Sequence, residues 1–191
     1  MDINQMIAER RTIRRFKQDA LPAGVLTRLV NAGRLAPSGA NLQPLEFICV
    51  DDPAVGREVF KFLAWAGYIS PAGTPPEGKT PTAYILVLVN TSVRKENYQY
   101  DVGASVENMI LSAQAEGLGC CWIASINRPA LNALAGIPAA YIVDAVLALG
   151  YPDESPVTEV LRDSCKYWKD AEGRLHVPKR GLEQVIHFNK F

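Results

Sequence analysis

Uniformly apolar runs and runs at helical spacing divide most of the chain. Residues 83–89 and 143–149 are almost entirely apolar and partly β-branched, which predicts two buried strands. A shorter apolar run predicts a strand over 46–50, and 117–125 reads as a helix stop that leads into another short strand. The sheet that these strands form is therefore expected to lie inside the protein.

Apolar residues at helical spacing predict five helices, over 3–11, 22–34, 54–66, 100–116 and 129–134. The strongest pattern is that of 100–116, which should be the central core helix. With about four strands interspersed among the helices, the sequence predicts an α+β fold around one sheet. No linker divides the chain, so one domain is expected over 1–191.

Three other segments carry no regular period. Residues 36–44 hold two prolines, a glycine and three hydrogen-bonding side chains, which excludes helix and strand. Residues 67–82 hold four prolines and three glycines and predict a long loop of the kind that forms lids or binding loops. Trp65 and Tyr68 lie at its entrance, where they either cover a planar ligand or, as is commoner, pack. The polar segment 152–181 is predicted to be irregular.

Composition excludes several classes of function. Lys+Arg and Asp+Glu both number 20, so the chain lacks the basic excess of a general nucleic-acid binder. No apolar run approaches the roughly 20 residues of a membrane span, and the first residues lack a secretory pattern. Two histidines are too few for a histidine metal site.

The four cysteines form no C-x-x-C pair and fit no zinc spacing. Cys49, Cys120 and Cys121 lie in apolar runs and are predicted to be small core residues. The fourth, Cys165, lies in a polar segment. A reduced, cytoplasmic setting is the simplest interpretation.

The densest positive charge lies in 10–16, where four arginines fall within six residues. This run is either a solvated basic face or a cradle for one phosphate. Thr12 adds a hydroxyl, Ile13 and Phe16 are expected to anchor the segment to the core, and arginine forks pair with phosphate oxygens. A second basic pair follows in the tail at 179–180, and the tail itself should extend the sheet or embrace a partner chain.

Residues 36–44 allow two interpretations. They form either a rigid polar loop that carries function next to a buried strand, or an ordinary connection between a helix and a strand. The residues alone leave both open.

Four segments together resemble the nitroreductase family of FMN-dependent oxidoreductases. They are E-R-R-T-I-R-R-F at 9–16, A-P-S-G-A-N-L-Q-P at 36–44, G-L-G-C-C-W-I at 117–123 and K-R-G-L-E-Q-V-I-H-F-N at 179–189. The resemblance implies a three-layer α+β fold, with a central, mostly antiparallel sheet flanked by helices and a swapped C-terminal tail. It also implies an intertwined homodimer with FMN at the interface, each flavin touching both chains.

The resemblance also implies roles for particular residues. Those that would hold the FMN phosphate are Arg10, Arg11 and Thr12, joined by Lys179 and Arg180. Arg14 would approach the ribityl or pyrimidine side of the ring. The residues that would line the flavin from the partner chain are Pro37, Ser38, Gly39, Asn41 and Gln43. Those that would run beside the ring are Trp122, Ile123, Ala124 and Ser125, with an N–H near Ala124 or Ser125 directed at flavin N5.

The implied activity is passage of hydride from NAD(P)H through the flavin to a flat acceptor, such as a nitroaromatic or a quinone, by a ping-pong mechanism. The flavin carries the chemistry, so no catalytic side chain and no metal is expected. The sequence agrees, since it shows no Ser/His/Asp or Cys/His arrangement, and Gly117-Leu118-Gly119 lacks the context of a dinucleotide fingerprint. Two alternatives are an FMN-binding storage or sensor protein and a flavin-free interaction module.

Overall fold

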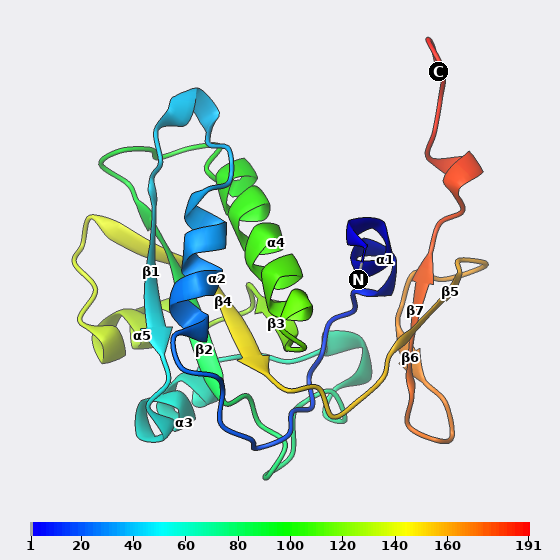
Figure 1. Cartoon of the computed structure of the whole chain (residues 1–191), viewed down its shortest axis with the longest axis horizontal. Coiled ribbons are helices and arrows are strands. Elements are labelled where there is room, and N and C mark those ends of the chain that lie inside the picture. Colours follow the sequence, from blue (N-terminus) through cyan, green and yellow to red (C-terminus); the bar gives the residue numbers. More distant parts are fainter. Residues whose placement is uncertain (1) are drawn as a thin grey trace.

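A four-stranded antiparallel sheet forms the centre of the protein (Figure 1), in the computed structural model that describes residues 2–191. Its strands follow the order β1, β2, β4, β3. They are β1 (Leu45–Val50), β2 (Ala83–Asn90), β3 (Gly119–Ile123) and β4 (Tyr141–Gly150). The four strands that the apolar runs predict are thereby confirmed.

Helices cover both faces of this sheet. On one face lie α2 (Val25–Arg34) and α4 (Gln99–Ala115), and on the other lie α3 (Pro53–Lys61) and α5 (Arg128–Ala135). The strand β2 contacts both layers because alternate side chains point to opposite faces: Ile85 and Val87 join the α2/α4 core, whereas Tyr84 and Leu86 join the α3/α5 core. The three-layer α+β fold is confirmed. The short α1 (Ile3–Glu9) lies beside α4 (Figure 1).

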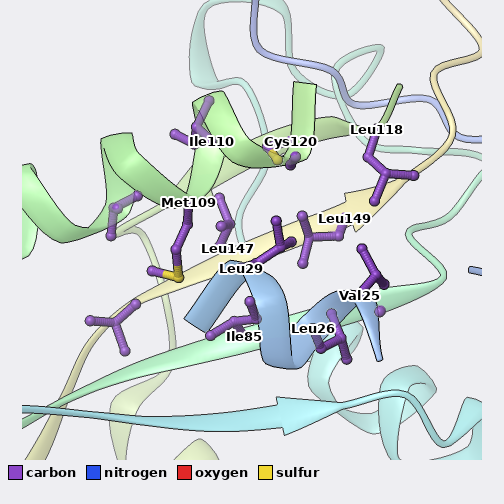
Figure 2. Packing of buried hydrophobic residues seen from close by; sticks show 14 of the residues in the cluster. Val25, Leu26, Leu29, Ile85, Met109, Ile110, Leu118, Cys120, Leu147 and Leu149 are labelled. Carbon is purple, nitrogen blue, oxygen red and sulfur yellow. The ribbon is translucent and has the colours of Figure 1, made fainter. Parts of the chain in front are cut away.

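The core between α2, α4 and the sheet contains Leu29, Met109, Leu147 and Leu149, all fully buried (Figure 2). The two helices approach closely at Gly33, where a Cβ atom would lie 2.9 Å from Met109 Cγ. No helix in the described part of the chain combines the length and apolarity that a membrane crossing requires.

A second, three-stranded sheet lies beside the main body (Figure 1). Its strands are β5 (Val157–Val160), β6 (Trp168–Lys169) and β7 (Leu175–Lys179), with β7 in the middle and parallel to β5. The predictions of a single sheet and of an irregular segment over 152–181 were therefore wrong. These strands are only two to five residues long, and β5 pairs with β7 across the intervening β6, so no local apolar run marks them.

Within residues 2–191 the tail does not extend the main sheet, because β7 pairs there with β5 and β6 alone. The η3 turn (Leu182–Gln184) follows, and residues 182–191 are exposed.

Two further predictions need correction. The helix predicted over 54–66 ends at Lys61, because the chain then pairs with another segment: Leu63 bridges Ile126, and the Ala64 N–H donates to the Ser125 carbonyl at 2.9 Å. Cys49 is exposed because β1 is an edge strand, whereas Cys120 and Cys121 are buried as predicted.

The small sheet is held by a polar cluster around His176 of β7. Its Nδ1 lies 3.2 Å from the Glu159 carboxylate and its Nε2 lies 3.0 Å from that of Asp170. Trp168 stacks on the imidazole with a centroid distance of 4.3 Å and donates from Nε1 to Glu159 at 2.8 Å. The hydrogen bond to Asp170, and then that to Glu159, raises the pKa of His176.

We expect His176→Gln to lower the melting temperature at acidic pH and to change it little at alkaline pH. A raised pKa means that the folded state holds the proton more tightly than the unfolded state. The extra stability is therefore fully present below the unfolded value of 6.5 and is lost as pH rises through the folded pKa. Calorimetry of His176→Gln and of the wild-type protein between about pH 5.5 and 9 measures this. A destabilisation by His176→Gln that stays constant with pH would contradict the expectation.

Candidate functional site

The arginine-rich segment 10–16 lies along β3 and is fixed by its backbone. Thr12 forms a parallel bridge with Cys120, and the Ile13 N–H donates to the Cys120 carbonyl at 2.9 Å. The Phe16 N–H donates to the Lys79 carbonyl at 3.0 Å. Ile13 and Phe16 are buried, which confirms that they anchor the segment.

Two glycines make room for these anchors. Gly119 of β3 pairs in register with Gly150 of β4. A Cβ atom on Gly119 would lie 2.7 Å from Ile13 Cγ1, and one on Gly150 would lie 2.8 Å from Phe16 Cδ1. The two anchors therefore pack directly on the backbone of the sheet, and the intervening arginines are presented from a fixed segment.

Arg10 and Arg11 are half-buried and adjacent. The Nε atom of Arg10 lies 3.2 Å from a carboxylate oxygen of Glu107 in α4. Arg11 donates from Nη2 to the Ala8 carbonyl at 2.6 Å and to Thr158 Oγ1 at 3.0 Å. Burial, and then the neighbouring charge of Arg10, lower the pKa of Arg11. The like charge of Arg10 disfavours the charged form of Arg11, and an anion bound nearby would relieve this repulsion.

Arg14 carries a donor without a partner. Its guanidinium lies over the ring of Tyr167, 5.2 Å from the centroid, while its buried Nε has no hydrogen-bond acceptor in residues 2–191. Buried donors are nearly always satisfied, so this one is available to a ligand or a partner group. The charge and the donors of this segment suit a phosphorylated ligand that also offers acceptors to Arg14.

The two aromatic residues at the entrance of the 67–82 loop behave differently. Trp65 is buried and packs against Phe60, with ring centroids 5.6 Å apart. Tyr68 is exposed and contacts Tyr167, with ring centroids 4.9 Å apart. The ring of Trp65 therefore packs in the core, although its buried Nε1 has no acceptor among residues 2–191, and Tyr68 lies on the surface beside the ring that covers Arg14.

The far end of β3 opens into a hollow of about 520 Å³, lined by residues 61–64 and 124–128. Ala124 and Ser125 are exposed on its wall, and within residues 2–191 neither amide donates a hydrogen bond. Trp122 is exposed, whereas the side chain of Ile123 is buried, so only the backbone of Ile123 could meet a ligand. From Cys120 to Ala124 the chain advances about 13 Å, so the arginine segment and the hollow lie toward opposite ends of β3.

The basic tail pair is brought toward the arginine segment by the small sheet. Thr158, which accepts from Arg11, pairs with Val177 of β7, two residues before Lys179. Lys179 and Arg180 are exposed at the end of that strand. Lys179 and Arg180 therefore lie at the end of a strand whose partner, β5, carries the contact of Arg11.

Residues 36–44 form a strained loop with one 3₁₀ turn at Gly39–Asn41. The φ angles of Ala40, Asn41 and Gln43 are 53°, 56° and 51°. Non-glycine residues in this region cost about 1–3 kcal/mol each, and such strain clusters at functional sites. Pro37, Gly39, Asn41 and Gln43 are exposed. The irregular loop is confirmed, and its strain favours a binding loop over an ordinary connection.

Within one chain, this loop does not meet the arginine segment. Gly39 is bonded to Asp101 in the first turn of α4, whereas Arg10 is bonded to Glu107 further along that helix. No hydrogen bond or ion pair among residues 2–191 joins 36–44 to 10–16. Figure 1 shows the loop above α2 and the arginine segment on the far side of α4.

Sequence reasoning missed several supporting residues. Glu154 accepts from the backbone N–H groups of Arg14 and Arg15. Tyr167 covers Arg14, and Asp101 holds the strained loop. Only Asp101 could be singled out from the sequence, because it is a carboxylate directly before Val102 in the apolar pattern of the core helix. Glu154 and Tyr167 are remote in sequence and polar, so nothing local marked them.

Several known proteins are similar to this chain in sequence or in fold. A protein of Archaeoglobus fulgidus named as a putative NADH dehydrogenase/NAD(P)H nitroreductase is 31% identical over 159 residues, which cover 78% of this chain and 85% of that protein. A 5,6-dimethylbenzimidazole synthase of Rhodospirillum rubrum is 25% identical over 176 residues, covering 80% and 83%. The solved structure of an FMN-dependent nitroreductase from Clostridium difficile R20291 superimposes with a TM-score of 0.68 at 22% identity, over 97% and 98% of the two chains. The sequence model of the Nitroreductase family matches residues 7–151, and the chain belongs to that family.

Proposed function

We propose that this protein is an FMN-dependent oxidoreductase that takes hydride from NAD(P)H and delivers it to a flat acceptor. The observation that carries the proposal is the half-buried arginine segment, whose Arg14 Nε has no acceptor in the described chain. Relatives named as NAD(P)H nitroreductase and FMN-dependent nitroreductase support the same cofactor and donor. The whole chain, 1–191, is proposed to act as one domain in the cytoplasm, and its four free thiols support that location.

The arginine segment would hold the phosphate. Arg10, Arg11 and Thr12 supply two guanidinium groups and a hydroxyl from a backbone that Ile13 and Phe16 fix. Lys179 and Arg180 would add positive charge from the small sheet. Arg14 would donate to the ribityl or pyrimidine side of the flavin. This donor set matches the chemistry of a phosphate followed by acceptor atoms.

A second copy of the chain would complete the site. The loop residues Pro37, Ser38, Gly39, Asn41 and Gln43 lie away from the arginine segment of their own chain, so they would line the flavin held by the partner. The tail that would embrace the partner exposes a set of large apolar residues: Leu182, Val185, Ile186, Phe188 and Phe191. Exposed apolar side chains in such number indicate an interface.

When bound, FMN would supply reversible hydride transfer. NAD(P)H and the acceptor would occupy the same binding site, one after the other. The chain's own part is to bind and orient the flavin. Arg14 would stabilise negative charge at the ring, and the amides of Ala124 and Ser125 would offer donors to its edge. The backbone around Trp122 and Ile123 would run beside the ring. The relatives carry different activities in their names, so the acceptor is proposed only as a class of flat molecules, such as nitroaromatics and quinones.

The purified protein is expected to show flavin absorption bands that bleach on anaerobic addition of NADH or NADPH. The donor that bleaches them faster is the preferred one. Bands that persist with both donors would favour the storage or sensor function. A colourless protein that takes up no added FMN would favour the flavin-free interaction module.

Initial-rate plots at several acceptor concentrations should be parallel, whereas intersecting lines would indicate a ternary complex and contradict the shared binding site.

A further inference from the structure

We propose that Asp101 and Arg94 are positioning residues that hold the loop 38–43 in the conformation that lines the flavin. This inference rests on the proposed function. It concerns residues that touch the loop from behind and do not themselves line the proposed site.

Asp101 gathers three donors at one buried carboxylate. It lies in the first turn of α4 and is 4% exposed. It accepts from Ser38 Oγ at 3.1 Å, from the Gly39 N–H at 2.9 Å and from Arg94 Nη1 at 3.3 Å. A buried carboxylate is tolerated only when it is paired and hydrogen-bonded, and the amino end of a helix also favours its charge. Two of the three donors belong to the loop, so the helix fixes the loop at this point.

Asp101 and Arg94 together form a clamp on the loop, and Arg94 holds the loop from the other side. Its Nη1 also lies 3.3 Å from the Gly39 carbonyl, and its Nε donates to the Glu96 carbonyl at 3.0 Å. Both backbone polar groups of Gly39 are thereby held, the N–H by Asp101 and the carbonyl by Arg94. A Cβ atom at position 39 would collide with this Nη1, so glycine is what lets the guanidinium approach.

Ser38 connects Asp101 to the strained part of the loop through two hydrogen bonds. Its hydroxyl donates its only proton to Asp101, and its oxygen accepts from the Gln43 N–H at 3.0 Å. This closes the loop around Ala40, Asn41 and Gln43, the three residues with positive φ. Strained backbone persists only where the surroundings determine it, and Asp101 provides that determination through Ser38 and Gly39. Ser38 therefore shapes the loop, and Asn41 and Gln43 are the exposed side chains that it presents.

The test uses the full-length protein and Asp101→Asn, which keeps the shape of the side chain and removes its charge. The matched control is Glu116→Gln, at the other end of α4, whose carboxylate pairs on the surface with Arg28. The readouts are the dissociation constant of FMN, the visible circular dichroism of the flavin at saturation and the melting temperature of the apoprotein. Asp101→Asn should weaken FMN binding about tenfold or more and alter the dichroism, because a misplaced loop changes contacts with the ring. Glu116→Gln should change neither.

A double-mutant cycle tests whether Ser38 and Asp101 affect FMN binding through the same loop. Ser38→Ala should reproduce much of the effect, and adding Asp101→Asn to it should cost less than the sum of the two, since both act through one loop. Equal FMN affinity and dichroism in Asp101→Asn and Glu116→Gln, with only a lower apoprotein melting temperature in the former, would overturn the inference. Should Asp101→Asn not fold, Arg94→Lys carries the same expectation and the same contrary result. A wild-type protein that binds no FMN would overturn the proposed function and this inference with it.

Discussion

Replacing Arg10 and Arg11 together with alanine is expected to give a folded protein that purifies without flavin. Each hydrogen bond to a charged group is worth about 1.5–3 kcal/mol, so losing two should weaken FMN binding more than a hundredfold. The fold should survive because the buried side chains of Ile13 and Phe16 anchor the segment, whereas the two arginines are only half-buried. The measurement is FMN content after gel filtration, followed by titration of the apoprotein with FMN.

The control for this variant removes the same charge elsewhere. Arg34→Ala with Arg57→Ala takes two exposed arginines from α2 and α3 and should leave FMN content unchanged. Arg11 also contacts Thr158, so its loss could act by loosening the small sheet. Thr158→Val removes that contact and keeps both arginines, and it should retain the flavin. Full FMN occupancy in the double arginine variant would rule out the phosphate cradle.

The sequence was informative wherever a local pattern dictates structure. The apolar runs at 83–89 and 143–149 became the buried centre of the sheet, because a strand covered on both faces must be apolar throughout. The prolines and polar residues of 36–44 likewise predicted an irregular loop, although not the positive φ angles that mark it as strained. Ile13 and Phe16 were recognised as anchors because apolar residues within a charged run need a core to pack on.

What the sequence did not show depends on contacts between distant segments. The small sheet was not predicted because β5, β6 and β7 are short, and because the side chains that join them, His176 with Glu159 and Asp170, come from three different segments. The clamp on the strained loop joins Asp101 to residues more than sixty positions earlier, and no periodicity encodes that pairing. Which residues meet across the proposed dimer is a further step of the same kind, and for the proposed flavin site it decides whether one chain can hold the ligand alone.

Placing aspartate at Leu182 and Phe188 is expected to produce a monomer that loses FMN. Both side chains are at least 70% exposed in the single chain, so the substitutions should not disturb its own core. In the proposed dimer they would be buried, where an unpaired carboxylate costs several kcal/mol, enough to dissociate most interfaces at micromolar concentration. Light scattering coupled to gel filtration measures the mass, and absorbance at the flavin bands measures FMN in the same peak.

The matched control introduces two aspartates at exposed apolar positions of the body, Val55→Asp and Leu134→Asp, on α3 and α5. That variant should remain a flavin-loaded dimer. Because the loop 36–44 and the arginine segment lie apart in one chain, mass and flavin should fall together in the tail variant. A stable monomer that keeps its flavin would mean that a single chain holds the ligand, and it would contradict the shared site. A dimer that keeps its flavin would instead place the contact between chains elsewhere than the tail.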